Sequence, residues 1–213
     1  MTTAQQIADR VKTGILTDTS NVRWAEVELL DWMNEGQLAL AVDTPDALMT
    51  TNSLALSAGT YQALPGTALR LISITSNTVS GTSIRRAHRD SLDIVSNIWR
   101  NSTAAVDVKE YFYLDTAPRE FTVYPSNTGA GAVTATYQKI PVTMPNMNAT
   151  LEINPQYEAS LINYIAYRCF SKDTEDVSPD LGRATSYYEL YLAATRTKNQ
   201  IDQEASPLRI EHD

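Results

Sequence analysis

The chain of 213 residues is 43% hydrophobic and 20% charged, a composition typical of a soluble globular protein that can bury one full core or two small ones. It holds no run of about 18 or more apolar residues and no basic-then-apolar leader at Met1, so we expect no membrane span, no signal peptide and synthesis in the cytosol. The net charge of −8 argues against a general nucleic-acid binder, which neutralises phosphates with clustered Lys and Arg, but it suits a surface that nucleic acid slides past without sticking.

The first predicted element is a helix over residues 2–16. Ile7, Val11 and Ile15 recur every fourth position and give this helix a narrow apolar seam. Polar turn residues follow at 16–21, so we expect the helix to fold back on the next one as a helical hairpin.

The second predicted helix, Asn21–Thr44, is the element around which we expect the chain ends to pack. Its apolar residues spread around most of the circumference, while Glu28, Asp31 and Glu35 share one narrow stripe. Such a helix needs neighbours on at least two sides, either at the centre of a bundle or between a bundle and a neighbouring subunit. The acidic stripe is expected to be a solvated face, with a cation site as the rarer alternative. Pro45 ends the helix, because the residue before a proline avoids the helical region.

Short alternating or β-branched runs replace the helical period in the middle of the chain. They predict an antiparallel sheet folded as a small sandwich or open barrel, with one short helix near residues 90–99. The predicted strands cover residues 53–56, 60–65, 68–75, 83–87, 108–114, 120–125 and 132–139.

Helical periodicity returns after a Pro- and Asn-rich connector over residues 141–155. Asn154-Pro155 has the form of a helix start, and another helix is predicted from near Pro179 to a polar stretch at 198–204. We therefore predict an α+β fold. It comprises an α-helical bundle formed by residues 1–50 and 151–204, an inserted β-sandwich or barrel-like domain over 51–150, and a C-terminal arm over 205–213.

The sequence contains no catalytic, phosphate-binding or metal-binding motif, so we predict a protein that is not an enzyme and uses no cofactor or metal. His88 and His212, the two histidines, are expected on the surface. Cys169 is the single cysteine, which excludes an internal disulfide and favours a buried thiol. Gly129 and Gly131 resemble half of a dinucleotide fingerprint, but a hairpin turn explains both glycines.

Charged residues at two places are candidates for contacts with a channel or a partner. Arg85, Arg86 and Arg89 form the basic cluster of this acidic chain, and we expect them either to be solvated or to meet an acidic partner or a DNA phosphate. The acidic stripe of the second helix is the other candidate.

Aromatic residues of the predicted bundle are candidates for subunit contacts. Tyr187 and Tyr188 are neighbours on a helix, where adjacent side chains diverge by about 100°, so one of the pair is expected at an interface. We assign Trp24 and Trp32 to the same kind of interface. The tail after Pro207 alternates apolar and polar residues, which leaves open an untethered tail or an arm that adds a strand or fills a groove on a partner.

These residues resemble those of a known group of proteins. The run from Asp18 to Gln37, which includes Asn21-Val22-Arg23-Trp24, Glu28-Leu29-Leu30, Trp32 and Asn34-Glu35, is similar to the start of head-to-tail connector (adaptor) proteins of tailed bacteriophages, particularly short-tailed ones. Further similarity covers Gly59–Pro65, Phe121–Pro125 and Asn154–Glu158, so the resemblance spans almost the whole chain.

The resemblance implies a structural virion protein at the junction of head and tail. It implies a dodecameric ring that docks under the portal protein, extends the DNA channel and offers a platform to a downstream tail or nozzle protein. With the charge and the lack of long apolar runs noted above, we also expect double-stranded DNA to pass without sequence-specific binding and no membrane partner. A C-terminal segment of such adaptors engages the portal, which by resemblance points to Leu208, Arg209 and Ile210.

Two other classes of function remain open at the level of sequence. In the first, the protein is a minor tail or receptor-binding protein whose β-domain recognises a ligand while the helices form a stalk. In the second, it is a tail-associated hydrolase, which would need an acid/base pair drawn from residues such as Asp90, Glu110 and Glu120.

Overall fold

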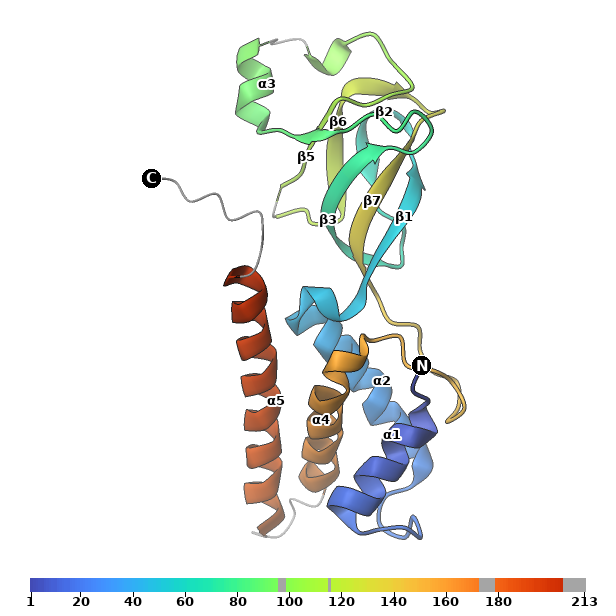
Figure 1. The fold of residues 1–213 in the computed structure, drawn as a ribbon, viewed down its shortest axis with the longest axis vertical. Coiled ribbons are helices and arrows are strands. Elements are labelled where there is room, and N and C mark those ends of the chain that lie inside the picture. The colour runs from blue at the N-terminus through green and yellow to red at the C-terminus, as the bar shows by residue number, and fades with distance from the viewer. Residues whose placement is uncertain (96–98, 115, 173–178, 205–213) are drawn as a thin grey trace. The chain divides into compact units, whose positions relative to one another are not determined.

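The computed structural model describes residues 1–95, 99–114, 116–172 and 179–204, and it shows an α+β protein, as predicted. Two compact units make up the fold (Figure 1). Residues 1–48 and 141–213 form the first, which we call the helical unit, and residues 49–140 form the second, the β-unit. None of the described helices is long and apolar enough to cross a membrane.

The helical unit is built on α2, which packs against both α1 and α4, while α5 lies along α4 (Figure 1). Thr3 caps α1, because its hydroxyl accepts a hydrogen bond from the Gln6 N–H at 3.3 Å. The helices are α1 (Ala4–Val11), α2 (Glu26–Asp43), α4 (Glu158–Ser171) and α5 (Pro179–Glu204), with a π-helical turn at Lys12–Leu16 and 3-10 turns at Pro45–Leu48 and Pro155–Tyr157.

The central helix begins at Glu26, five residues after Asn21, where the predicted helix starts. The carboxylate of Asp18 accepts hydrogen bonds from three backbone N–H groups, those of Val22, Arg23 and Trp24, at 2.9 to 3.1 Å. These bonds hold residues 22–24 in a turn and also keep the pKa of Asp18 below its usual range. A helix through the same residues would break this arrangement, and α2 therefore starts after it.

Aromatic rings fill the centre of the helical unit. Trp24 packs edge-on against Phe170 of α4, and its indole N–H donates to the carbonyl of Cys169 at 3.0 Å. Tyr164 of α4 meets Tyr191 of α5 in a T-shaped contact with ring centres 5.3 Å apart. Cys169 is buried, as predicted, and burial raises the pKa of its thiol to about 12.

Two polar side chains of α2 hold the connector that follows the β-unit. The carboxamide of Asn34 accepts from the Met144 N–H at 2.8 Å and donates to the Met144 carbonyl at 3.2 Å. Gln37, which is almost fully buried, accepts from the Glu152 N–H at 3.1 Å. The connector has no regular helix or strand before Pro155, so these side chains supply hydrogen bonds that its backbone lacks.

The β-unit contains two sheets, one of three strands in the order β1-β7-β3 and one of four strands in the order β2-β6-β5-β4. Neighbouring strands are antiparallel, except that β4 pairs with β5 in parallel, which the sequence did not predict. The strands are β1 (Met49–Ala55), β2 (Ala58–Ala63), β3 (Ala68–Asn77), β4 (Arg85–Arg86), β5 (Glu110–Phe112), β6 (Glu120–Thr128) and β7 (Ala132–Lys139). Helix α3 (Arg89–Val95) and a 3-10 turn (Trp99–Asn101) stand where one longer helix was predicted.

A buried asparagine joins β3 to the segment that leads into β5. Asn77 donates to the Val108 carbonyl and accepts from the Val108 N–H, both at 2.8 Å. This pair of bonds satisfies both backbone groups of Val108, which is itself buried.

The contact between α2 and α4 generates a prediction about stability. A Cβ added at Gly36 would lie 2.6 Å from Cδ1 of Leu161 and 2.9 Å from the ring of Tyr164, and both side chains are buried. We expect Gly36→Ala to lower the free energy of unfolding by about 1–3 kcal/mol, measured by urea titration with circular dichroism. Gly182→Ala, in open space on α5, is the control and should be neutral or stabilising by up to about 1 kcal/mol. Equal effects of the two substitutions would contradict close packing at Gly36.

The ion pair between Lys12 and Glu26 generates a prediction about pH. Nζ of the buried Lys12 lies 2.8 Å from Oε1 of Glu26, and this hydrogen bond lowers the pKa of Glu26 below its usual value. A carboxylate with a lowered folded-state pKa stabilises the protein above its unfolded pKa, and the contribution disappears as the pH falls through the folded value. Glu26→Gln should therefore unfold more easily than wild type at pH 7, by about 1 kcal/mol since Glu26 is partly exposed, and equally easily at an acidic pH below the lowered pKa of Glu26.

The matched control for Glu26 is Glu189→Gln, an exposed carboxylate on α5. It should leave stability unchanged at both pH values. A difference between Glu26→Gln and wild type that persists at low pH would show that the effect is not the loss of the ion pair.

Candidate functional site

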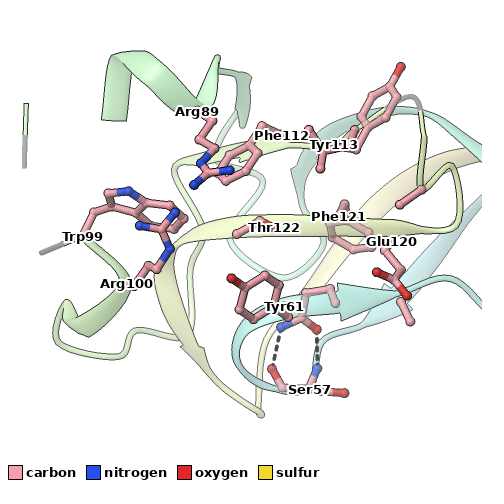
Figure 2. Close-up of a pocket in the computed structure, with 14 residues that line it drawn as sticks. Ser57, Tyr61, Arg89, Trp99, Arg100, Phe112, Tyr113, Glu120, Phe121 and Thr122 are labelled. Atoms are coloured by element: carbon pink, nitrogen blue, oxygen red, sulfur yellow. Dashed lines mark hydrogen bonds between the residues drawn. The ribbon is translucent and has the colours of Figure 1, made fainter. Parts of the chain in front are cut away.

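A hollow in the β-unit combines aromatic side chains with two arginines. Its volume is about 480 Å³, and strands β2, β5 and β6 line it together with the start of α3 and the 3-10 turn at Trp99–Asn101 (Figure 2). The aromatic lining residues are Tyr61, Trp99, Phe112, Tyr113 and Phe121. A mostly apolar hollow with a few polar groups at its rim is the general form of a binding site.

Trp99 anchors this hollow. Its side chain is 1% exposed and meets the ring of Phe112 edge-on, with ring centres 5.4 Å apart. The indole N–H donates to Oδ1 of Asp93 in α3 at 2.7 Å, which ties the 3-10 turn to that helix. The guanidinium of Arg100 lies over the Trp99 ring, 4.3 Å from its centre.

Arginine and aspartate side chains lie together at the rim of the hollow near α3. Asp93 is shared by Arg89, at 3.4 Å from Nε, and Arg100, at 3.4 Å from Nη1. The indole N–H of Trp99 and then the two arginines lower the pKa of Asp93, so this carboxyl is ionised at neutral pH. Asp90 of α3 and Glu120 in the lining add further negative charge, so the two arginines are the groups of this rim that can meet an anionic group of a partner.

Strand β2 closes the other side of the hollow. Tyr61 is 71% exposed there, and Figure 2 shows its ring beside β6 with the hydroxyl turned away from Glu120. Gln62 fixes the start of β2, because its amide accepts from the Ser57 N–H at 2.7 Å and donates to the Ser57 carbonyl at 2.8 Å (Figure 2). The exposed ring and the arginines are suited to hold an apolar or aromatic group next to an anionic one.

The basic cluster predicted from sequence lies beside this hollow only in part. Arg89 lines the hollow, whereas Arg85 and Arg86 form strand β4 with exposed side chains. The guanidinium of Arg86 lies 4.6 Å from the centre of the Tyr113 ring, and Tyr113 is also a lining residue. The cluster and the hollow therefore share one region of the β-unit.

The acidic stripe of α2 is partly neutralised by basic residues in and just after α4. Nζ of Lys172 lies 2.6 Å from Oε1 of Glu28, and Arg168 forms an ion pair with Glu35. Asp31, between them, is exposed. In the part of the chain that the structure describes, no group of three His, Cys, Asp or Glu side chains could hold a metal ion.

The four aromatic residues assigned to subunit interfaces lie in different environments. Trp24 is 3% exposed and belongs to the core of its own helical unit, so it has little surface to offer a neighbouring subunit. Trp32 and Tyr187 are partly buried, and Tyr187 stacks on Phe170 at 5.7 Å between ring centres. Tyr188 is 40% exposed and contacts the rings of Tyr167 and Tyr191.

The other residues named from the sequence lie in different parts of the chain. Leu208, Arg209 and Ile210, assigned to portal binding, lie outside the described residues, as does His212. His88 is exposed just before α3, as predicted. Asp90 lies in α3 and Glu110 begins β5, while Glu120 begins β6 and lines the hollow.

The interface residues predicted from the sequence did not include an exposed apolar face of α2. Val27, Leu38 and Val42 are 70%, 44% and 63% exposed on the side of α2 that faces away from α1 and α4. The spread of apolar residues around this helix was the available signal, but periodicity could not tell which side the chain itself would cover. The residues of the hollow were also missed, because five separate segments supply them.

Charge is divided unevenly between the two units. The β-unit contains eight Lys and Arg against six Asp and Glu, a net charge of +2. The remainder of the chain contains nine Lys and Arg against nineteen Asp and Glu, a net charge of −10. The helical unit therefore carries all of the net negative charge of the protein.

Comparison with known proteins identifies one family. The model of a family described as SU10 adaptor protein matches residues 2–211, nearly the whole chain. No curated protein matches the chain.

Proposed function

The chain belongs to the SU10 adaptor protein family, and we propose that it is a structural component of a phage virion that joins the portal protein of the head to the tail. The family match over residues 2–211 carries this proposal. In the proposed assembly the protein forms a ring, of dodecameric symmetry by its resemblance to head-to-tail connectors, which continues the DNA channel below the portal. It is made in the host cytoplasm and does not act as an enzyme.

The surface of the helical unit supports a role in ring formation. Val27, Leu38 and Val42 leave an apolar face on α2 next to the exposed Asp31, and Tyr188 adds an exposed ring on α5. Exposed apolar residues gathered on one helix face are typical of a surface that another protein covers. We assign this face, rather than Trp24, to the contact between neighbouring subunits.

The charge of the helical unit supports a role as a channel wall. Its net charge of −10 repels the DNA phosphates, so double-stranded DNA can pass without being held. Asp31 shares its face of α2 with the exposed apolar residues, so of the two roles considered for the acidic stripe we assign it a contact with a neighbouring subunit. Glu28 and Glu35 pair with Lys172 and Arg168. The β-unit, with its excess of basic residues, is the part we assign to the downstream tail or nozzle protein.

A second candidate function rests on the hollow of the β-unit. Its exposed Tyr61 and its arginines would also suit a minor tail or receptor-binding module that recognises a ligand. Light scattering after size-exclusion chromatography separates the two candidates. A ring that forms with the portal protein favours the adaptor, whereas a small closed oligomer such as a trimer that ignores the portal favours the binding module.

Portal docking through the C-terminal arm is tested with the purified portal protein of the same virus. We expect the wild-type chain to join the portal in a stoichiometric ring, and Leu208→Asp/Ile210→Asp to lose this binding, because charges replace the two apolar residues assigned to the contact. Val79→Asp, on an exposed turn of the β-unit, is the control and should dock normally. Normal docking of the double variant would contradict the role assigned to the arm. Absence of docking by the wild-type chain would contradict the adaptor function itself.

Tail docking through the basic region of the β-unit is tested with the next tail component. Arg86→Glu/Arg89→Glu should weaken that binding by about tenfold and reduce its salt dependence, since it reverses two charges facing an acidic partner. The control is Arg70→Glu/Arg119→Glu, which changes the charge of the same unit equally at exposed positions outside the cluster. Portal binding should be unaffected in both variants. Equal weakening by the two pairs would mean that only the net charge of the β-unit matters.

A further inference from the structure

The edge of strand β1 differs from the other sheet edges of the β-unit. An edge strand presents unpaired N–H and C=O groups that can pair with another chain, and proteins protect such edges with charges, bulges, short strands or covering segments. The two sheets have four edges, formed by β1 and β3 in one sheet and by β2 and β4 in the other.

Three of these edges are protected. β4 is two residues long and both are arginine. β2 is broken by a shift in register between Gly59 and Tyr61. β3 is covered along its free side, where the Leu71 N–H donates to the Pro118 carbonyl and the Ile84 N–H donates to the Thr75 carbonyl, both at 2.9 Å.

Strand β1 has none of these protections. Its seven residues, Met49–Ala55, pair with β7 in continuous register and include no proline, glycine or charged residue. Among the described residues, β7 is the one strand with which β1 pairs. Thr51, Asn52 and Ser53 in its middle are exposed, so this edge is open to another strand.

The hydrogen bonds of β7 show which backbone groups of β1 point to the open edge. Just beyond β1, the Leu56 N–H donates to the Gly131 carbonyl at 2.9 Å, and in the register of this pair Leu56 lies opposite Gly131. Hydrogen-bonded pairs alternate along antiparallel strands, so the even-numbered residues of β1 bond to β7. The odd-numbered residues therefore turn their N–H and C=O groups outward: Met49, Thr51, Ser53 and Ala55.

We propose that β1 pairs with β1 of a second copy of the chain, antiparallel and two-fold symmetric about Asn52. In this register Thr51 lies opposite Ser53 of the second copy and Met49 lies opposite Ala55, so all four outward-facing residues form hydrogen-bonded pairs. Asn52 lies opposite Asn52 of the second copy, across the two-fold axis, in a non-hydrogen-bonded pair. The two three-stranded sheets become one sheet of six strands.

The protection of the other three edges indicates which strand pairs with β1. The other edges of the described β-unit are protected, so the open edge that a second copy offers to β1 is its own β1. The side chains that meet are also compatible, because no like charges face each other and hydroxyl groups meet as Thr51 and Thr136 do within one chain, at 2.8 Å.

A two-fold contact closes on itself, so it cannot repeat from subunit to subunit around a ring of equivalent subunits. We therefore place this pairing in the free protein, before the ring proposed above is assembled. The inference does not depend on the adaptor function, because the open edge belongs to the isolated chain. Failure of portal docking and failure of strand pairing would accordingly be separate results.

Disulfide trapping tests the pairing on the full-length protein. In a non-hydrogen-bonded pair the two Cα atoms lie about 4.5 Å apart, within the range that a disulfide bridges. The one native cysteine, Cys169, is buried, so it gives a low background. We expect Asn52→Cys, oxidised with glutathione disulfide under native conditions, to form a covalent dimer on non-reducing gels. Val79→Cys, 87% exposed on a turn, is the control and should stay largely monomeric.

A charge exchange in the Asn52→Cys background tests the register. Thr51→Glu/Ser53→Glu places like charges opposite each other in both pairs and should lower the yield of the dimer by about tenfold. Thr51→Lys/Ser53→Glu places opposite charges there and should restore the yield. The proposal would be overturned if Asn52→Cys formed no more dimer than Val79→Cys. It would also be overturned if the two charge variants gave the same yield of dimer. Dimerisation seen by light scattering without trapping at residue 52 would overturn it as well, by showing that another surface is used.

Discussion

The helical unit depends on how closely α2 can approach α4. Gly36 leaves room for the side chains of Leu161 and Tyr164 to lie against the backbone of α2, where any side chain of its own would push the helices apart. Close contact brings Trp24 within reach of the Cys169 carbonyl at the start of α2. Further along the same helix, Asn34 and Gln37 bond the connector that returns from the β-unit. One helix therefore determines the positions of α4 and of the returning chain.

The features that suit an adaptor are spread over surfaces and do not converge on a pocket. An acidic helical unit, an apolar face on α2 and a basic region on the β-unit each favour a different neighbour. Such a division is physically reasonable in a protein that must touch several partners at once, since the sign of charge and the exposure of apolar groups both select what can approach. The hollow near Trp99 adds a place where an aromatic or apolar side chain of a partner can be buried.

Periodicity in the sequence was sufficient to predict the α+β class and most helices and strands, because each element buries one face at a regular spacing. Periodicity failed where hydrogen bonds to one side chain determine the backbone conformation. Asp18 holds the turn at residues 22–24 and delays α2, and no repeat in the sequence signals such a bond. The acidic stripe was expected to be solvated, but Glu28 and Glu35 form ion pairs with Lys172, just after α4, and Arg168 of α4, more than 130 residues away in the chain. The hollow could not be predicted for the same reason, since Trp99 and Phe112 come from different elements.

The point at which the chain enters and leaves the β-unit has a further consequence. Entry is through β1 and exit through β7, and Met49 at the start of β1 lies directly opposite Gln138 near the end of β7. The two ends of the inserted segment are therefore neighbours across one pair of strands, and a short loop could join the remaining chain in its place. The segment of the gene that encodes residues 49–140 could therefore be exchanged as one unit. Recombination between related phages could replace it with another insert, changing the β-unit while the helices are inherited unaltered.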